Sequence, residues 1–458
     1  MDQPDVKRIA LFLAILAGFL TPFDLSAVNI ALPTIGTEFT MDAIMMGWVA
    51  TAYLLAAAVF LVPCGRIADI YGRKKLFISG LSVFTLASFL MTVSISSLMI
   101  ILLRVLQGAG AAMFSGTAVA ILTEATPREE RGKALGFYST SVYLGLSLGP
   151  FLGGFLTNVF GWRSIFFVNV PIGLVTIAII LSRLDREWAD AKGETFDLRG
   201  ALLYGMALIA VMYGFSLLPN PLGAGFLVSG SVLLGAFVVA EVRTQNPLID
   251  LRLFRANRVF AFSNLAALIN YSATFAVTFF LSFYLQYIRG LPPSFAGIIL
   301  VTQPIVQAVF SSPAGRLSDW IEPGRIASMG MGLTATGLLA CVFLGADTPL
   351  SVLIGVLALL GFGFALFSSP NTNAIMSAVE KRYYGVASGT LGTMRLVGQM
   401  LSMGIAMMIL ALFVGRVAIT PDAYPGLLTS IRAGFSIFSV LCIFGIYFSL
   451  ARGKLRAP

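Results

Sequence analysis

Fourteen apolar stretches, each of about 20 residues, recur along the whole of this 458-residue chain. A stretch of that length crosses the hydrocarbon core of a bilayer as an α-helix. Charged residues supply only 11% of the sequence, whereas soluble domains carry about 25%. The sequence therefore predicts an all-α integral membrane protein, with helices near residues 9–31, 46–64, 76–94, 98–123, 133–157, 162–182, 200–219, 223–242, 259–287, 294–312, 325–346, 350–376, 384–414 and 431–450.

Lysine and arginine are distributed unevenly among the connections between these stretches. With the N-terminus in the cytoplasm, 24 of the 30 fall on the inner side, four on the outer side, and Arg104 and Arg395 within helices. An excess of cations in the inner loops is the rule for helical membrane proteins. Both termini are therefore expected in the cytoplasm, and the net charge of +9 reflects membrane topology rather than binding of nucleic acid.

The second half of the sequence repeats the first. The run from Gly65 to Asp69 recurs at 315–319, and the glycine-rich run 108–115 recurs at 361–368. The offset between the copies exceeds the length of six helices with short loops, which indicates two helices inserted between two homologous halves. The predicted organisation is an N-terminal six-helix half at 1–183, a linker with two inserted helices at 184–257, and a C-terminal six-helix half at 258–458.

Repeated helical halves favour a secondary transporter, because two such halves can rock about a site between them. The sequence has no histidine, no metal-ligand spacing, no phosphate-binding glycine loop and no soluble segment of domain size. We therefore expect neither an enzyme nor a bound metal or cofactor. An ion channel and a receptor that does not transport remain open; saturable exchange flux rejects the channel, and net movement of ligand rejects the receptor.

Two charged residues are expected deep in the membrane, where a charge costs about 2.5–3.5 kcal/mol on insertion scales and therefore needs a reason. Asp24, preceded by Pro22, lies in the outer half of the first helix and could bind a proton or a substrate cation. Arg104 in the fourth helix could promote proton release from a facing carboxylate. Alternatively, both side chains only bond to neighbouring helices and specify packing.

The connection at 65–75 places one acid and four bases within eleven residues. Its glycines allow a tight turn, and its aspartate could cap a helix or pair with a nearby arginine such as Arg131. This loop is a candidate conformational switch, although its cations also hold the loop inside. The candidate switch residues are Gly65, Asp69, Gly72, Arg73 and Arg131.

The fifth helix carries a proline within a face of glycines. Such a face permits close packing against another helix, and the proline permits bending, so this segment either takes part in gating or only packs closely. The motif consists of Gly145, Gly149, Pro150, Gly153 and Gly154.

Polar and aromatic residues inside other helices could line a central cavity, where aromatic faces suit lipophilic cations. Many residues of this kind in a large bundle are instead interhelical hydrogen-bond partners. The candidates are Asn29, Tyr53, Gln107, Tyr143, Asn270, Tyr271, Gln303, Gln307, Asn371, Asn373 and Arg395.

Taken together, these motifs resemble those of the major facilitator superfamily. The resemblance rests on the run Asp24 to Pro33, the 65–75 loop, the run Arg104 to Gly110 and the run Gly145 to Gly154, and it covers essentially the whole chain. The fourteen helices and the run Trp162 to Pro171 are similar to those of its fourteen-helix drug/proton antiporter family.

The resemblance implies a role for each motif. In that family the motif of the fifth helix is associated with antiport, which here falls on Gly149 and Pro150. The loop after the second helix is associated with conformational switching, which falls on Asp69 and Arg73, and the arginine of the fourth helix, here Arg104, is associated with proton transfer.

The chain departs from the family pattern at Ile70, where a base is usual, and at Trp320, where the second copy of the loop lacks its basic cluster. We therefore expect a weaker latch in the C-terminal half. Asp24 is the sole deep carboxylate, which favours neutral or monocationic substrates over divalent cations.

The predicted function is proton-coupled export of hydrophobic, cationic drugs by alternating access. The expected setting is the cytoplasmic membrane of a prokaryote, with a monomeric protein whose partners are small molecules, protons and the lipid bilayer. A dedicated exporter of one metabolite, peptide, antibiotic or siderophore is the alternative, and the breadth of the response to a drug panel separates the two.

Overall fold

The computed structural model describes residues 3–127, 130–244, 247–249, 251–380 and 384–453. These residues form fourteen helical spans that are long and apolar enough to cross a membrane, which confirms the predicted fold class. The first six spans are α1 (Gln3–Glu38), α2 (Ala43–Tyr71), α3 (Arg73–Thr92), α4 (Ser97–Ala125), α5 (Arg131–Phe160) and α6 (Arg163–Arg183). The next two are α7 (Leu198–Leu217) and α8 (Pro221–Arg243).

The last six spans include two that are built from consecutive helices. The short helix α9 (Arg252–Ala256) precedes them. One composite span comprises α10 (Arg258–Thr274), α11 (Ala276–Phe283) and a π-helical turn at Tyr284–Ile288, and the other comprises α12 (Pro293–Leu300) and α13 (Thr302–Trp320). The remainder are α14 (Pro323–Val342), α15 (Leu350–Ser377), α16 (Tyr384–Phe413) and α17 (Tyr424–Ala451), the last preceded by a 3₁₀ turn at Pro421–Ala423.

Polar residues just before several helices fix where these helices begin. The Asp42 side chain accepts a hydrogen bond from the backbone N–H of Met45 at 2.7 Å, and Asp197 accepts one from Gly200 at 2.9 Å. Such caps satisfy N–H groups that have no partner within the helix. The apolar runs therefore become helices with defined ends, rather than continuing into the connecting loops.

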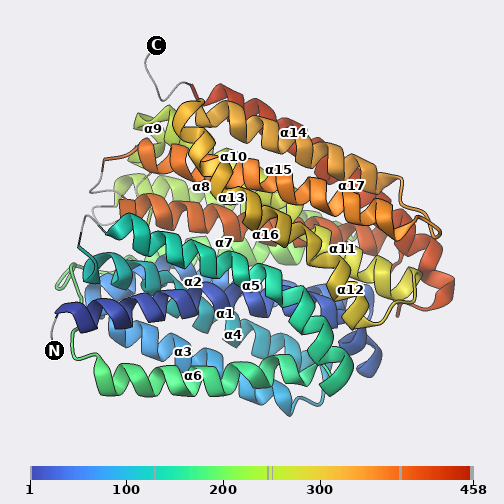
Figure 1. Cartoon of the computed structure of the whole chain (residues 1–458), viewed down its shortest axis with the longest axis horizontal. Helices are drawn as coiled ribbons and strands as arrows, with labels where there is room; N and C mark the ends of the chain where they lie inside the picture. The colour runs from blue at the N-terminus through green and yellow to red at the C-terminus, as the bar shows by residue number, and fades with distance from the viewer. Residues whose placement is uncertain (1–2, 128–129, 245–246, 250, 381–383, 454–458) are drawn as a thin grey trace.

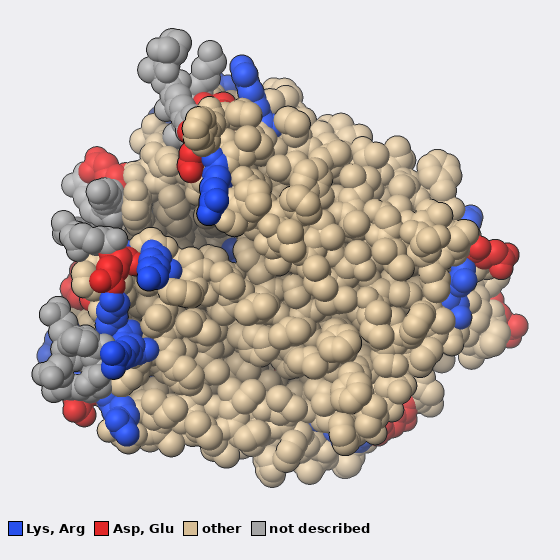
Figure 2. Space-filling view, in the orientation of Figure 1, with Lys and Arg blue, Asp and Glu red and all other residues tan. Residues whose placement is uncertain are grey.

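The helices form two bundles that lie side by side, as Figure 1 shows, with α1–α6 in one and α10–α17 in the other. Both chain ends lie at the same end of the molecule. Lysine and arginine side chains gather chiefly at that end in the space-filling view (Figure 2). This distribution is the one that the positive-inside rule requires if the end with the termini faces the cytoplasm.

Equivalent glycines of the two repeats make equivalent contacts. A Cβ on Gly108 of α4 would lie 2.3 Å from the carbonyl oxygen of Tyr53 in α2. A Cβ on Gly361 of α15 would lie 2.3 Å from the carbonyl oxygen of Gln303 in α13. Only glycine permits such an approach of two helix backbones. The repeated sequence therefore produces the same helix packing in both halves.

The inserted helix α7 lies against both halves. The hydroxyl of Tyr204 donates a hydrogen bond to the carbonyl oxygen of Ala58 in α2 at 3.1 Å. On the other side, a Cβ on Gly404 of α16 would lie 2.9 Å from the ring of Phe215 in α7. Helix α8 packs on α7. The predicted boundaries at 183/184 and 257/258 fall between helices, and the division into three parts stays a prediction.

Candidate functional site

The carboxylate of Asp24 lies inside the N-terminal half, completely buried in α1. Its Oδ2 forms an ion pair with Nη1 of Arg104 in α4 at 2.5 Å. Its Oδ1 accepts hydrogen bonds from Nε2 of Gln107 at 3.0 Å and from Nδ2 of Asn169 in α6 at 3.1 Å. Gln107 Nε2 also donates to the hydroxyl of Ser88 in α3 at 2.9 Å. The network therefore joins α1, α3, α4 and α6 around one neutralised carboxylate.

Arg104 is held on its other sides as well. Its Nε donates to the carbonyl oxygen of Val49 in α2 at 3.0 Å, and its guanidinium lies 4.3 Å from the centre of the Tyr53 ring. The side chains of Asp24 and Arg104 are both 0% exposed. The pair is therefore shielded from the bulk solvent in this conformation.

Two members of this network were not predicted as site residues. Asn169 is a lone amide in the apolar run of α6, and such a group in a membrane helix needs an interhelical partner, so this signal was available in the sequence. Ser88 carries no comparable signal, because serines recur along many of the helices.

The predicted switch loop forms ion pairs between α2 and α3. Oδ1 of Asp69 lies 2.7 Å from Nη2 of Arg73, which also lies 2.8 Å from Oδ2 of Asp190. Arg131, the partner suggested by the sequence, instead donates through Nε to the carbonyl oxygen of Thr126 at 3.2 Å. Arg73 takes the place of Arg131 because it follows Asp69 by one helical turn across the junction of the two helices.

The two glycines of this loop have different roles. Gly72 has a φ of 122°, a conformation that favours glycine, and it forms the turn between α2 and α3. Gly65 lies inside α2, which continues to Tyr71. The expectation that both glycines shape the turn therefore holds for Gly72 and is wrong for Gly65.

The linker at 184–197 binds the switch loop through its backbone. The N–H of Arg73 donates to the carbonyl oxygen of Trp188 at 2.9 Å, and the N–H of Ala191 donates to the carbonyl oxygen of Asp69 at 2.9 Å. The sequence indicated only a charged connection here. In this conformation the switch loop is thus bonded to the segment that leads into α7.

A further ion pair at the inner surface joins Lys7 of α1 to Glu130, which immediately precedes α5. The hydrogen bond from Lys7 lowers the pKa of Glu130 below its ordinary value. Both side chains are partly exposed, so solvent screening keeps the contribution of this pair to stability small.

The glycines of the α5 motif face α1. A Cβ on Gly145 would lie 2.5 Å from the carbonyl oxygen of Phe19, and one on Gly153 would lie 2.6 Å from Cα of Ala27. Between these two points, a Cβ on Gly149 would lie 2.5 Å from Cβ of Ser26. The glycine face therefore brings α1 and α5 into close contact, and it holds the helix that carries Asp24.

Pro150 and Gly154 lie where α5 meets the C-terminal half. A Cβ on Gly154 would lie 2.4 Å from the carbonyl oxygen of Pro293, and a Cβ on Gly297 of α12 would lie 2.2 Å from the carbonyl oxygen of Pro150. The backbones of the two halves thus touch directly toward the outer ends of these helices. We call this contact, formed by Pro150, Gly154, Pro293 and Gly297, the outer contact.

Bonds from α11 and from the π-helical turn that follows it to α1 reinforce this closure. The hydroxyl of Ser282 donates to the carbonyl oxygen of Asn29 at 2.9 Å, and Nε2 of Gln286 donates to that of Ile30 at 2.9 Å. Figure 2 shows a recess between the two bundles at the opposite end, which carries the termini. The protein is therefore closed on the outer side and recessed on the inner side.

The predicted cavity residues divide by burial. Asn371 illustrates the buried group: it donates to the carbonyl oxygen of Ser263 and accepts from Arg452, so it links helices. Tyr143, Gln303, Asn373 and Arg395 are half-buried. Buried in this conformation are Asn29, Tyr53, Gln107, Asn270, Tyr271, Gln307 and Asn371.

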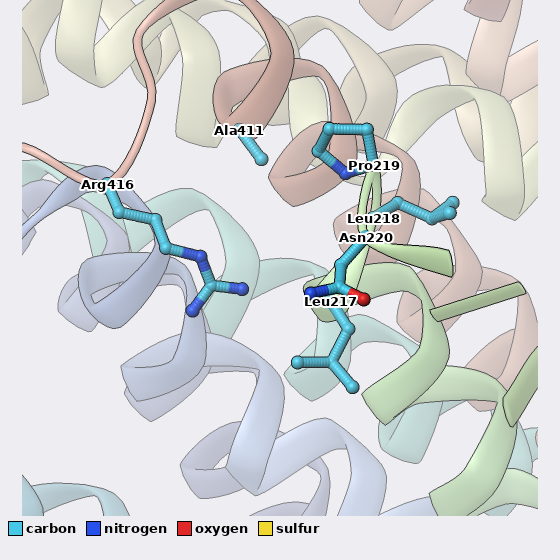
Figure 3. Close-up of a pocket in the computed structure, with 6 residues that line it drawn as sticks. All are labelled: Leu217, Leu218, Pro219, Asn220, Ala411 and Arg416. Atoms are coloured by element: carbon cyan, nitrogen blue, oxygen red, sulfur yellow. The ribbon is translucent and has the colours of Figure 1, made fainter. Parts of the chain in front are cut away.

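A pocket of about 640 Å³ lies elsewhere, at the outer end of the insert (Figure 3). Nη2 of Arg416 donates to the carbonyl oxygen of Ser216 at 2.8 Å beside it, and so joins the end of α16 to α7. The pocket contains none of the predicted site residues, and we assign it no role in transport. It is lined by Leu217, Leu218, Pro219, Asn220, Ala411 and Arg416.

Among the described residues, no group of three or more His, Cys, Asp or Glu side chains is arranged to hold a metal ion. The molecule consists of two helical bundles with equivalent glycine contacts, a closed outer side and a buried ion pair. These features are typical of a transport protein rather than an enzyme. The chain belongs to the Major Facilitator Superfamily, whose model matches residues 14–403 and 264–455.

Comparison with known proteins gives both drug exporters and a vitamin transporter. The chain is 32% identical to the riboflavin transporter RibZ of Clostridioides difficile, over 85% of each chain. It is 31% identical to the multidrug resistance protein Stp of Mycobacterium tuberculosis, over 86% of this chain and 74% of that protein. It is 29% identical to the tetracenomycin C resistance and export protein of Streptomyces glaucescens, over 88% and 76% of the two chains.

Solved structures share the fold. A bacterial homologue of the human lysosomal transporter Spinster, in an inward-facing and unoccupied conformation, superposes with a TM-score of 0.72 and 17% identity over 98% of this chain and 97% of that one. A D-xylose–proton symporter superposes with a TM-score of 0.68 and 13% identity over 96% of each chain.

Proposed function

We propose that this protein exports hydrophobic compounds across the cytoplasmic membrane in exchange for protons, by alternating access and without a cofactor. The observation that carries the proposal is the sealed pair of Asp24 and Arg104 at the centre of the N-terminal half. A titratable carboxylate in such a position is the usual mark of a proton pathway in a membrane protein. Relatives whose names include drug resistance and export support the outward direction.

The proposed coupling works through the charge of Asp24. Protonation removes the negative charge that holds Arg104, and a neutral carboxyl is a weaker hydrogen-bond acceptor than a carboxylate for Gln107 and Asn169. The bonds that join α1 to α4 and α6 then weaken. Because the glycines of α5 pack directly on α1, a shift of α1 passes to α5 and to the outer contact.

In the proposed transport cycle, the outer contact is the gate on the outer side. In the closed state the backbones of α5 and α12 touch, and opening requires Gly154 to separate from Pro293. Access of protons to Asp24 and opening of the outer side are thereby linked in one movement. We further propose that the protein acts as a monomer, as predicted from the sequence.

The cationic preference expected from the sequence rested on Asp24 and on aromatic faces in the cavity. Arg104 neutralises Asp24 within the N-terminal half, so this carboxylate offers no free charge to a cationic substrate. The proposal is therefore limited to hydrophobic substrates.

Proteoliposomes with an imposed pH gradient test the proposal. We would follow uptake of a panel of lipophilic dyes by the native chain and by Asp24→Asn, and in parallel measure dye exchange without a gradient. The expected result is that Asp24→Asn loses gradient-driven uptake but retains exchange. Gradient-driven uptake that survives in Asp24→Asn would place proton coupling elsewhere. Glu130→Gln, which removes an acid at the inner surface, is the matched control.

A dedicated exporter of one metabolite is the second candidate, and the 32% identity to a protein named as a riboflavin transporter favours it. The same liposomes distinguish the two candidates. Saturable transport of riboflavin, with no response to the other compounds of the panel, would favour the dedicated transporter, and transport of several unrelated dyes would favour the broad exporter.

A further inference from the structure

The second arginine within the membrane, Arg395 of α16, has surroundings unlike those of Arg104. Its guanidinium lies 5.5 Å from the centre of the Tyr271 ring in α10. Tyr138 and Tyr143 of α5, in the opposite half, lie close enough to interact with it electrostatically. The side chain is half-buried, so part of it stays exposed in a conformation whose outer side is closed.

These groups lie at a common depth between the two halves. Arg395 follows the inner end of α16 at Tyr384 by 11 residues, and Tyr143 follows the inner end of α5 at Arg131 by 12. Helices rise by about 1.5 Å per residue, so the two side chains are level within the membrane. Tyr143 also approaches the C-terminal half directly, with its hydroxyl 3.4 Å from that of Ser368.

The charge of Arg395 lacks the compensation that Arg104 has. Among the described residues, no acidic side chain forms an ion pair with Arg395. Its Nε is buried and has no hydrogen-bond partner within the described part of the chain. The guanidinium interacts with the neutral side chain of Tyr271, which leaves its positive charge unbalanced. A guanidinium without an acidic partner attracts an anion and repels a cation when water is scarce.

The aromatic side chains around Arg395 add a preference for flat molecules. The ring of Tyr271 packs edge-to-face on Phe364 of α15, with centroids 5.6 Å apart and an interplanar angle of 71°. Aromatic rings and a planar guanidinium both stack on planar ligands. A flat molecule with an anionic group could stack against the half-buried ring of Tyr143 and accept hydrogen bonds from Arg395, while the buried ring of Tyr271 positions the guanidinium.

We propose that Arg395, with Tyr271 and Tyr143, forms a substrate subsite that selects planar aromatic anions over cations of the same size. The inference rests on the proposed export function and specifies its substrate class. The subsite is positively charged, so it repels a cationic substrate and attracts an anionic one.

Binding of two matched xanthene dyes to the purified full-length protein tests the inference. Fluorescein is the anionic probe and rhodamine 123 is the cationic probe, and fluorescence anisotropy gives the dissociation constant of each. We expect the native chain to bind fluorescein more tightly. Arg395→Gln should weaken fluorescein binding by roughly tenfold or more, the value of a lost charge-assisted hydrogen bond, without weakening rhodamine binding.

Two further variants make the result decisive. Arg395→Lys keeps the charge but not the planar donor, so its affinity for fluorescein should lie between those of the native chain and Arg395→Gln. Arg416→Gln removes an arginine just beyond the outer end of α16, away from the subsite, and should leave both affinities unchanged. A native preference for rhodamine 123, or fluorescein binding that Arg395→Gln leaves intact, would overturn the inference.

Failure of the subsite and failure of the export function give different results. Gradient-driven uptake of the dye panel in liposomes measures export without reference to Arg395. Uptake that persists while the anion preference is absent rejects the subsite alone. An anion preference in binding without any gradient-driven uptake rejects proton-coupled export and leaves the subsite supported.

Discussion

Addition of a single methyl group at Gly154 should disrupt the outer contact. Gly154→Ala places a Cβ 2.4 Å from the carbonyl oxygen of Pro293, whereas ordinary contacts begin at 3.4 Å. The two backbones must therefore separate by about 1 Å on the outer side. Neither atom is the end of a flexible side chain, so the strain cannot be relieved by a change of rotamer.

The energetic consequence follows from the cost of overpacking, which is about 1–3 kcal/mol. Because the clash exists only when the outer side is closed, this cost falls on the closed state and not on the open one. The equilibrium should shift toward the open state by roughly 5- to 150-fold. Gly297→Ala, which meets the carbonyl oxygen of Pro150 at 2.2 Å, should shift it in the same direction.

Spin labels on the outer loops measure this shift. Cysteines introduced at Ile95 and Asp347, both exposed, place one label on each half, and the native cysteines of the chain are buried. Pulsed electron paramagnetic resonance should show a longer distance population in Gly154→Ala than in the parent.

Gly80→Ala is the matched control for this measurement. Its Cβ would lie 2.8 Å from the carbonyl oxygen of Gly110 in α4, away from α5 and within the same half, so it should lower stability without changing the distribution of label distances. If Gly80→Ala opens the outer side as much as Gly154→Ala does, or if neither variant opens it, the outer contact is not the gate.

Three further predictions concern the switch loop, the buried pair and the inner surface. Gly72→Ala should lower stability by about 1–3 kcal/mol, because the φ of Gly72 is strained for any other residue. Gly65→Ala should raise stability by up to about 1 kcal/mol, because alanine favours the interior of a helix more than glycine does. Thermal unfolding in detergent compares the two variants. Asp24→Asn should lower the free energy of unfolding by about 3–5 kcal/mol, because it leaves the buried charge of Arg104 unpaired. Adding Arg104→Gln should recover part of that loss. Additive effects of the two substitutions in a double-mutant cycle would refute an interaction between the two side chains. Because the pKa of Glu130 is lowered in the folded state, its ion pair stabilises the protein above the ordinary glutamate pKa and the effect is lost as pH falls through the lowered value. Glu130→Gln should therefore lower the melting temperature at neutral pH and have no effect in acid.

The sequence predicted the helices because the signal for a membrane span is local. Length and hydrophobicity suffice, and the positions of lysine and arginine add the orientation. Close packing of the α5 glycines on another helix also follows from a local feature, since a glycine face permits such an approach. That this helix is α1 comes from the structure. The duplicated motifs extended the same reasoning to the C-terminal half.

The partners of charged groups were harder to predict. Asp69 pairs with Arg73, and Asp190 of the linker completes the set, because the linker folds back on the loop through backbone hydrogen bonds. No local pattern encodes that return. The surroundings of Arg395 likewise depend on tyrosines that lie more than 100 residues away in the sequence.

The position of α7 has a consequence for how lipophilic molecules reach the space between the halves. The halves meet along two flanks of the molecule, one between α2 and α16 and one between α5 and α13. Tyr204 and Phe215 of α7 cover the first flank. Under the proposed export of hydrophobic compounds, a molecule dissolved in the membrane meets a shielded flank on that side, and we expect any lateral entry at the flank formed by α5 and α13.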